Sequence, residues 1–204
     1  TGDEASAARY IECRLSELAK EVLFNPDITE YTESYDGRNK EPVTLPAKIP
    51  VLLLMGAEGI AVGMSTKILP HNFNELLDAQ IKILKGEKFE VYPDFPQGGL
   101  IDVSEYKKGN GKVTIRAVIE VKDNKTIVIK EIPYGTTTQS LISSIENGVR
   151  KGKIKIATIN DYTAEKVEIE LKTARGENAE DVLNSLYAFS DCQITTTLSL
   201  ITIV

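Results

Sequence analysis

Residues 113–132 read VTIRAVIEVKDNKTIVIKEI, and this stretch decides the fold class. Its two halves are rich in β-branched residues and largely alternate between apolar and polar positions, which is typical of half-buried strands. The interruption around Asp123 and Asn124 carries residue types that turns favour. The sequence therefore predicts a β-hairpin of strands 113–121 and 126–132, and Pro133 should end its second strand.

Helical and strand patterns alternate on the C-terminal side of this hairpin. Leu141, Ile145 and Val149 share one face of an expected helix over residues 138–151. Two strands, a helix and a last strand should follow, over 153–159, 166–172, 178–189 and 192–204. Strand, strand, helix twice over indicates an α+β fold with antiparallel sheets covered by helices.

One amphipathic helix is expected near the start of the chain, over residues 11–24. Its apolar stripe consists of Ile11, Leu15, Leu18 and Val22. It should stop before Pro26, because the residue preceding proline avoids the helical conformation. Residues 25–50 then form a long irregular stretch with three prolines, where we place the boundary between a unit 1–24 and a unit 51–204.

The apolar segment VLLLMGAEGIAVGMST, residues 51–66, is interrupted by three glycines. Glycines at this spacing imply turns or a close approach of the backbone, and not one continuous element. Asn72 and Glu75 then resemble a capping box, and Gly86 is placed to end a helix over 73–85.

Composition limits the classes of function. The formal net charge of −6 argues against a nucleic-acid footprint over the whole surface, because duplex binding depends on neutralising phosphates with Lys and Arg. Any DNA contact should therefore be local, as in residues 45–72, where Lys48 and Lys67 outnumber Glu58. The chain has one histidine and no P-loop, GxGxxG or Ser/His/Asp pattern, which argues against a self-sufficient hydrolase or kinase.

Neither a membrane span nor an export signal is expected. No apolar run approaches the roughly 20 residues of a membrane-spanning helix, and the first residues, TGDEASAARY, lack the regions of a signal peptide. Cys13 and Cys192 lie far apart in no metal-ligand pattern, so we expect two reduced thiols in a cytoplasmic protein and no metal site.

Arg9 and Tyr10 form the one candidate pair for covalent chemistry. A phenol is protonated at neutral pH and needs activation before it attacks phosphorus. A neighbouring guanidinium supports both the phenolate and the oxygens of the transferring phosphoryl group, and the start of the expected helix favours an anion. From the residues alone, surface packing is the more common role of such a pair.

Several segments taken together resemble the A subunits of bacterial type IIA topoisomerases, DNA gyrase and topoisomerase IV. TGDEASAARYIECRL, at the start, is similar to the stretch that carries that family's nucleophilic tyrosine. SYDGRNKEPVTLPAKIP resembles its Tyr-Asp-Gly loop and the start of its tower domain, and GAEGIAVGMSTKILPHNFNELLDA resembles its most recognisable stretch. YPDFPQGG, IKEIPY and LYAFSDCQ follow in the family's order. Met55 before Gly56, and Leu69 in place of a first proline, are more similar to topoisomerase IV than to gyrase.

The resemblance implies a role for six residues. Tyr10 would form a 5′-phosphotyrosyl bond with the cut strand, with Arg9 as its electrostatic partner. Ile60 matches the hydrophobic wedge that the family inserts between base pairs to bend DNA, at a cost of a few kcal/mol that new contacts offset. Phosphate contacts are expected from Lys48, Lys67 and His71.

Each role has an alternative that the residues leave open. Ile60 could be a buried residue of a short strand, as aliphatic residues in such runs usually are. His71 could cap the helix that starts after Asn72. The whole chain could be a module that bends DNA or docks a partner while Tyr10 is inert. It could also be an unrelated α+β scaffold with the Ile60 region packed inside.

The resemblance also implies an assembly. The enzyme would contain two A and two B subunits, A2B2, that cut one double-stranded DNA and pass another through it in the cytoplasmic nucleoid. The B subunit would bind ATP and Mg²⁺, so neither cofactor is expected here. Residues 1–24 would end a winged-helix region, 25–50 would connect, and 51–204 would be the tower-like domain. The helix-turn-helix region where quinolones bind would lie upstream, so this chain alone is expected not to cleave DNA.

Overall fold

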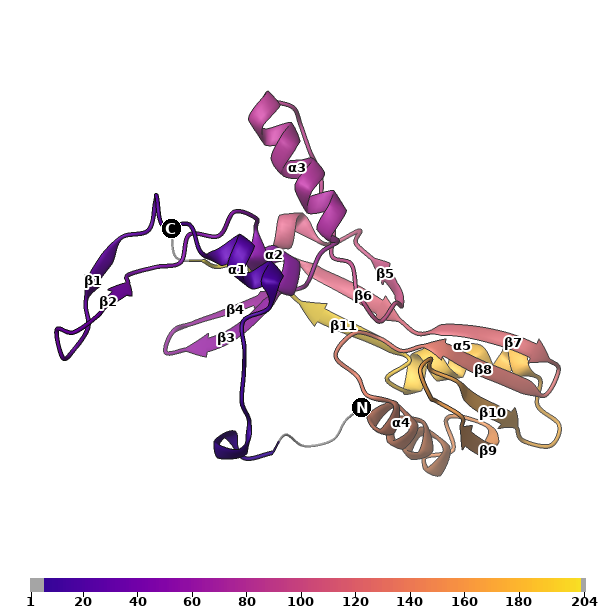
Figure 1. Cartoon of the computed structure of the whole chain (residues 1–204). Helices are drawn as coiled ribbons and strands as arrows, with labels where there is room; N and C mark the ends of the chain where they lie inside the picture. The colour runs from indigo at the N-terminus through magenta and orange to yellow at the C-terminus, as the bar shows by residue number, and fades with distance from the viewer. Residues whose placement is uncertain (1–5, 203–204) are drawn as a thin grey trace.

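The computed structural model describes residues 6–202, and its fold is α+β (Figure 1). The first five residues of the tyrosine-bearing motif and the last two of the expected final strand lie outside this range. The elements are η1 (Ala8–Tyr10), α1 (Glu17–Leu23), β1 (Tyr31–Glu33), β2 (Lys40–Pro42), α2 (Val51–Met55), β3 (Ala57–Ala61), β4 (Met64–Ile68), α3 (Phe73–Lys85), β5 (Leu100–Asp102), η2 (Lys107–Gly109), β6 (Lys112–Arg116), β7 (Val118–Asp123), β8 (Thr126–Glu131), α4 (Thr138–Arg150), β9 (Ile156–Asp161), β10 (Ile169–Thr173), α5 (Ala179–Phe189) and β11 (Gln193–Thr197).

The predicted repeat of strand, strand, helix builds one antiparallel sheet. Its strand order is β7-β8-β10-β9, so the two hairpins meet where β8 pairs with β10. Ile129 lies opposite Ile169 and Ile127 opposite Leu171, and because side chains alternate along a strand, all four point to one face. Helices α4 and α5 cover that face, and their buried residues complete the core: Leu141, Ile145, Ala179, Val182 and Leu186. We call this part, from β7 to α5, the four-stranded unit.

The expected strand over residues 113–121 is in fact two strands in two sheets. β6 is the middle strand of a sheet ordered β11-β6-β5, whereas β7 is an edge strand of the four-stranded unit. Between them Ala117 is fully buried, and its N–H donates to the carbonyl of Cys192 at 2.8 Å. The alternation of apolar residues continues through this change of sheet, and for this reason the pattern does not mark it.

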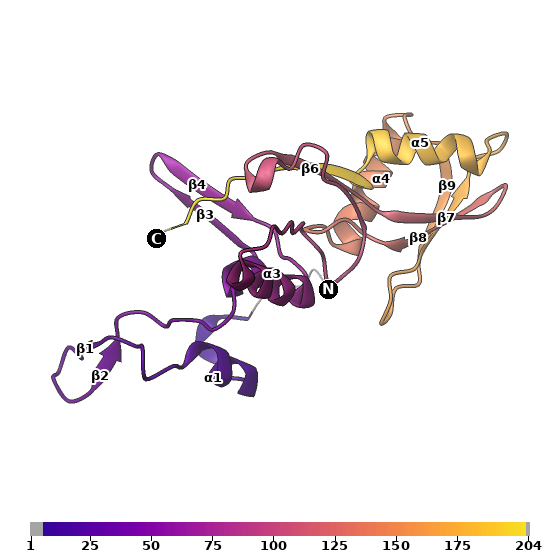
Figure 2. The ribbon, with the colours of Figure 1, turned by 90° about the horizontal axis from the view of Figure 1, so that it is seen from above.

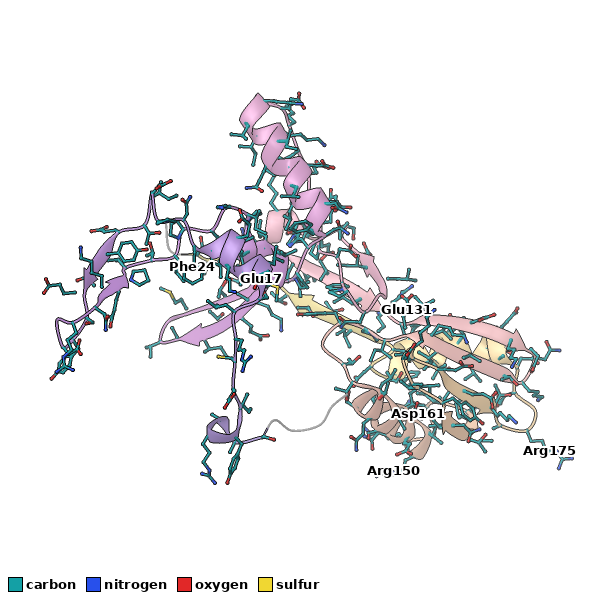
Figure 3. The ribbon with its side chains drawn as sticks, viewed as in Figure 1. Glu17, Phe24, Glu131, Arg150, Asp161 and Arg175 are labelled. Carbon is teal, nitrogen blue, oxygen red and sulfur yellow. The ribbon has the colours of Figure 1, made fainter. Side chains whose placement is uncertain are left out.

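The two sheets are also joined on the side of β8. Glu131, at the end of that strand, accepts a hydrogen bond from the backbone N–H of Gly99, just before β5. Figure 3 places Glu131 near the junction, while Arg150 and Arg175 mark the outer parts of the four-stranded unit.

The N-terminal helix is shorter than predicted. Helix α1 begins at Glu17, because Ser16 caps it by accepting the N–H of Ala19 at 3.1 Å. It ends before Pro26, as predicted. Glu17 and Phe24 mark its two ends in Figure 3. Of the expected apolar stripe only Val22 is buried.

Residues 25–50 are not irregular throughout. β1 and β2 form an antiparallel hairpin, and the side chain of Asp36 holds its tip by accepting the N–H of Arg38 at 3.0 Å. The backbone N–H of Lys48 donates to the Val22 carbonyl at 3.0 Å, which attaches the end of this stretch to α1. The division into units 1–24, 25–50 and 51–204 stays a prediction.

The three-glycine segment folds as a short helix followed by a hairpin, which agrees with the predicted turns. α2 gives way to β3 at Gly56, and the turn between β3 and β4 holds Gly63, both with positive φ, 70° and 82°. The predicted helix after it is confirmed as α3. Asn72 caps it by accepting the N–H of Asn74 and of Glu75, and Gly86 ends it in the left-handed conformation.

Seen from above, the β3–β4 hairpin extends away from the rest of the molecule, with the C-terminal segment beside it (Figure 2). Within residues 6–202, none of the helices combines the length and the apolar character needed to cross a membrane.

Candidate nucleic-acid interface

The β3–β4 hairpin presents aliphatic side chains to solvent. Its register pairs Ile60 with Ser65 and Ala61 with Met64, so the turn consists of Val62 and Gly63. Ile60 is 89% exposed, Val62 is fully exposed, and Met64 is largely exposed. Ile60 is therefore no core residue, and the alternative of a scaffold with this region packed inside is wrong.

Among the described residues, backbone pairing holds the hairpin along its β4 edge. The backbone N–H of Lys67 donates to the Ser199 carbonyl at 2.9 Å, and the N–H of Ser199 donates back to Lys67 at 3.2 Å. The Thr66 hydroxyl also donates to the Ser199 carbonyl, at 3.0 Å. Within the described range β3 pairs only with β4. The hairpin is thus anchored near its base while the tip around Ile60 stays free.

Two exposed residues of the tip were not among the sequence predictions. Val62 lies in the turn, and Met64 pairs with Ala61, so Met64 lies on the opposite face of the hairpin from Ile60. Their places on either side of Gly63, a residue type that favours turns, could have pointed to them.

The two predicted phosphate-binding lysines both lie in ion pairs. Lys48 Nζ is 2.7 Å from a carboxylate oxygen of Glu21, and Lys67 Nζ is 3.2 Å from one of Glu58. The hydrogen bond from Lys48 is the main cause that lowers the pKa of Glu21, followed by its charge. Ion pairs this exposed contribute little to stability, so a phosphate can replace the carboxylate.

His71 is buried, and both ring nitrogens have partners inside the protein. Nδ1 lies 3.0 Å from the Leu53 carbonyl oxygen, and Nε2 lies 3.3 Å from the Tyr106 hydroxyl. Burial lowers the pKa of His71, so the ring is neutral near pH 7. The alternative that His71 caps α3 is wrong, because Asn72 does so. A phosphate contact would require a ring nitrogen to leave its partner inside the protein.

Tyr10 and Arg9 lie on a separate segment. They are the last two residues of η1, a 3-10 helix of one turn, in which the Tyr10 N–H donates to the Ala7 carbonyl at 2.9 Å. Tyr10 is 73% exposed, and the guanidinium carbon of Arg9 is 4.9 Å from the centre of its ring. The expected place of Tyr10 at the mouth of the first helix is wrong, because α1 starts only at Glu17.

The structure therefore gathers some predicted residues and separates others. Ile60 and Lys67 share the hairpin, and His71 lies at its base. Lys48 lies beside α1. Within residues 6–202 no hydrogen bond or ion pair connects Arg9 or Tyr10 to the hairpin.

The described residues contain no metal-binding cluster, and their buried cysteine is not a reactive thiolate. Residues 6–202 contain no group of three His, Cys, Asp or Glu side chains that could hold a metal ion. Cys192 is buried, and burial raises the pKa of its thiol to about 11, which disfavours the reactive thiolate.

The sequence is similar to known proteins over its whole length. The family of the A subunits of DNA gyrase and topoisomerase IV matches residues 1–204. The chain is 59% identical over 201 residues to the A subunit of DNA topoisomerase 4 from Borreliella burgdorferi, covering 98% of this chain and 32% of that protein. It is 38% identical over 226 residues to the DNA gyrase A subunit of Lawsonia intracellularis, covering 100% and 27%. For the gyrase A subunit of Streptomyces coelicolor the identity is 36% over 222 residues, covering 94% and 25%. The chain thus spans about a third or less of the length of these relatives.

Proposed function

The chain belongs to the family of DNA gyrase and topoisomerase IV A subunits, and we propose that it is part of a DNA-cleaving subunit whose Tyr10 attacks DNA while its β3–β4 hairpin bends it. The observation that carries the proposal is the exposure of Ile60, 89%, at a free hairpin in the segment most similar to the family. A protein surface rarely gathers aliphatic side chains without a partner to cover them.

The proposed reaction is a transesterification at a backbone phosphodiester. The Tyr10 oxygen attacks phosphorus, and the bond from phosphorus to the 3′ oxygen of the neighbouring sugar breaks. The phenol gives up its proton and the departing 3′ oxygen gains one, leaving a 5′-phosphotyrosyl ester and a free 3′ hydroxyl. The phosphoester bond is exchanged and not hydrolysed, so rejoining is the same step in reverse.

Arg9 would assist this step through charge. Its guanidinium lies 4.9 Å from the Tyr10 ring centre, so it can move with the phenol and face the phosphoryl oxygens. Fixed positive charge beside a developing anion is a large source of transition-state stabilisation.

Ile60 would act as the wedge. Inserting an aliphatic side chain between two base pairs costs a few kcal/mol of stacking, which contacts with the bent DNA offset. Val62, in the turn of the hairpin, would cover the opened step. Lys48 and Lys67 would exchange their carboxylate partners for phosphates.

The remaining parts of the activity would come from elsewhere in an A2B2 assembly with a B subunit. We place ATP hydrolysis and the Mg²⁺ site in that partner. The identity of 59% to a topoisomerase 4 protein, against 38% and 36% to gyrase proteins, supports a topoisomerase IV-like enzyme acting on the nucleoid in the cytoplasm.

The test is Tyr10→Phe in the full-length protein, reconstituted with its B subunit. Protein attached covalently to DNA is recovered under denaturing conditions, and relaxation and unlinking are measured. We expect both covalent complexes and strand passage to vanish. Tyr35→Phe is the matched control, because Tyr35 is also exposed but lies at the tip of the β1–β2 hairpin. If Tyr10→Phe keeps strand passage, the chain is a bending or docking module and the proposal fails.

A further inference from the structure

The β3–β4 hairpin has two stems that meet at its base. The incoming stem is α2, which is only five residues long and turns into β3 at Gly56. The outgoing stem runs from the end of β4 at Ile68 through Pro70 to His71. A helix this short leaves its last carbonyls without helical partners.

His71 supplies the missing partner for one of these carbonyls. Its Nδ1 is 3.0 Å from the Leu53 carbonyl oxygen, across 18 residues of chain. A carbonyl oxygen only accepts, so Nδ1 carries the hydrogen and donates. In the neutral ring Nε2 then accepts from the Tyr106 hydroxyl, 3.3 Å away. The Leu53 carbonyl and the Tyr106 hydroxyl thus favour the neutral tautomer of His71 that carries its hydrogen on Nδ1.

Tyr106 connects this bond to the body of the protein. It belongs to the second hydrophobic core, which also contains Val113 and Ile115 of β6. Its ring meets that of Tyr92 edge to face, with centres 5.8 Å apart. The histidine therefore links the incoming stem of the hairpin to the three-stranded sheet.

The two stems also touch directly at Gly56. A Cβ on this residue would lie 2.7 Å from the Ile68 carbonyl oxygen and 2.9 Å from the Pro70 nitrogen. The outgoing stem is held in turn by the loop before β5, where the Asp94 N–H donates to the Pro70 carbonyl at 2.9 Å. Little freedom remains for the stems to move against each other.

We propose that His71 is a positioning residue which, by joining Leu53 to Tyr106, sets the direction of the β3–β4 hairpin and so aims Ile60 at the DNA. We call Leu53, Gly56, His71 and Tyr106 the hairpin-base clamp. The claim that Ile60 is aimed at DNA rests on the proposed function, whereas the claim that His71 sets the direction of the hairpin is independent of it. In this role the imidazole is neutral and stays inside, and it touches no phosphate.

The experiment compares four variants of the full-length protein with the parent, each paired with its B subunit. His71→Ala removes both bonds of the clamp, Tyr106→Phe removes one, and His71→Asn keeps an amide N–H where Nδ1–H was. Val182→Ala is the matched control, because it opens a small cavity in the core of the four-stranded unit, far from the clamp in sequence. All measurements are made well below the unfolding temperature of each variant.

The first measurement is amide hydrogen exchange in peptides covering residues 57–68. Losing a buried hydrogen bond should speed exchange there about tenfold in His71→Ala, with partial rescue in His71→Asn, and Val182→Ala should leave these peptides unchanged. Unchanged exchange in His71→Ala overturns the clamp.

The second measurement is bending of a DNA duplex labelled at both ends, followed by energy transfer at saturating enzyme. We expect the bent fraction to fall about threefold or more in His71→Ala, with DNA affinity changed less than about twofold, because a misdirected wedge shifts the population of bent complexes without removing a phosphate contact. The contrary result is a fall in DNA affinity in His71→Ala together with a decrease of about one in the slope of log affinity against log salt concentration. That result would mean that His71 contacts a phosphate, and the positioning role would be wrong. If the parent enzyme neither bends nor cleaves DNA, the proposed function fails, and hydrogen exchange alone decides the clamp.

Discussion

The four-stranded unit and the β3–β4 hairpin are both antiparallel and both rich in aliphatic residues, yet isoleucine is buried in the first and exposed in the second. Ile129 in β8 is 0% exposed, and Ile60 in β3 is 89% exposed. Helices α4 and α5 cover the face of the sheet that carries Ile129, whereas Figure 1 shows no helix of the described chain packed against the turn end of the β3–β4 hairpin. Burial therefore depends on whether a second layer covers the strand, and the residue type does not decide it.

This contrast separates residues that stabilise the fold from residues that are available for binding. Exposed aliphatic side chains contribute little to folding in the free protein, because they remain in water. When a partner covers these side chains, their burial contributes a favourable hydrophobic free energy to binding. Four predictions test the contrast, in decreasing order of their effect on the free energy of unfolding.

The largest decrease in the free energy of unfolding is expected from Ile129→Ala. The side chain lies in the core between the sheet and helices α4 and α5, so its removal leaves a cavity. We expect the free energy of unfolding to fall by about 2–5 kcal/mol in urea titrations followed by circular dichroism. A loss below about 1 kcal/mol would mean that the four-stranded unit is loosely packed.

The next effect concerns the turn from α2 into β3. Gly56→Ala combines a positive φ of 70° with a Cβ only 2.7 Å from the Ile68 carbonyl oxygen. We expect a loss of about 2–3 kcal/mol, measured in the same titrations, because both strain and overpacking oppose the change. Gly59→Ala is the control, since its Cβ would make an ordinary contact of 3.7 Å with Thr66. Equal effects at both glycines would contradict the close approach of the stems.

A smaller effect is expected from pH, through His71. Burial lowers the pKa of this imidazole in the folded chain, so the unfolded chain, with a histidine pKa of about 6.5, binds the proton first as pH falls. The free energy of unfolding should be constant above about pH 6.5 and should decrease as pH falls from there toward the lowered pKa.

Urea titrations between pH 5 and 8 measure this dependence. His71→Asn should remove it, because asparagine does not titrate. The lowered pKa values of the Asp36, Asp102 and Asp123 carboxyls place their own losses of stability at more acidic pH. A pH-independent parent chain between 5 and 7 would contradict a buried, neutral His71.

The smallest effect on stability is expected from Ile60→Ala. Because the side chain is almost fully in water, the free energy of unfolding should change by no more than about 0.5 kcal/mol. The same variant in the full-length enzyme should bend DNA less, as measured by energy transfer between labelled ends. A large loss of stability would mean that Ile60 packs against the protein.

Much of the fold could be predicted because its determinants lie close together in the chain. Asn72 accepts the N–H groups of residues two and three positions later, and Gly86 ends the same helix. The Asp123 side chain accepts the N–H of Lys125 and so shapes the turn between β7 and β8. Bonds of this range depend on local sequence, so the predicted bounds of α3 and of β8, and the turn before β8, lie near the observed ones.

The same holds for part of the candidate site. A resemblance over a continuous stretch singles out Ile60, and the structure exposes it. The predicted start of the first helix is wrong, because the apolar stripe reaches further than the helix that Ser16 caps.

Local sequence patterns encode most of the helices and strands, and a resemblance over one stretch marks the segment that carries the proposed wedge. Packing between distant parts of the chain sets three other features: the change of sheet at Ala117, the burial of Ile129 but not of Ile60, and the hydrogen bonds of His71 to Leu53 and Tyr106. The partners of His71 are 18 and 35 residues away along the chain. Contacts at that separation depend on how sheets and helices pack against one another, and no short pattern of residues encodes this.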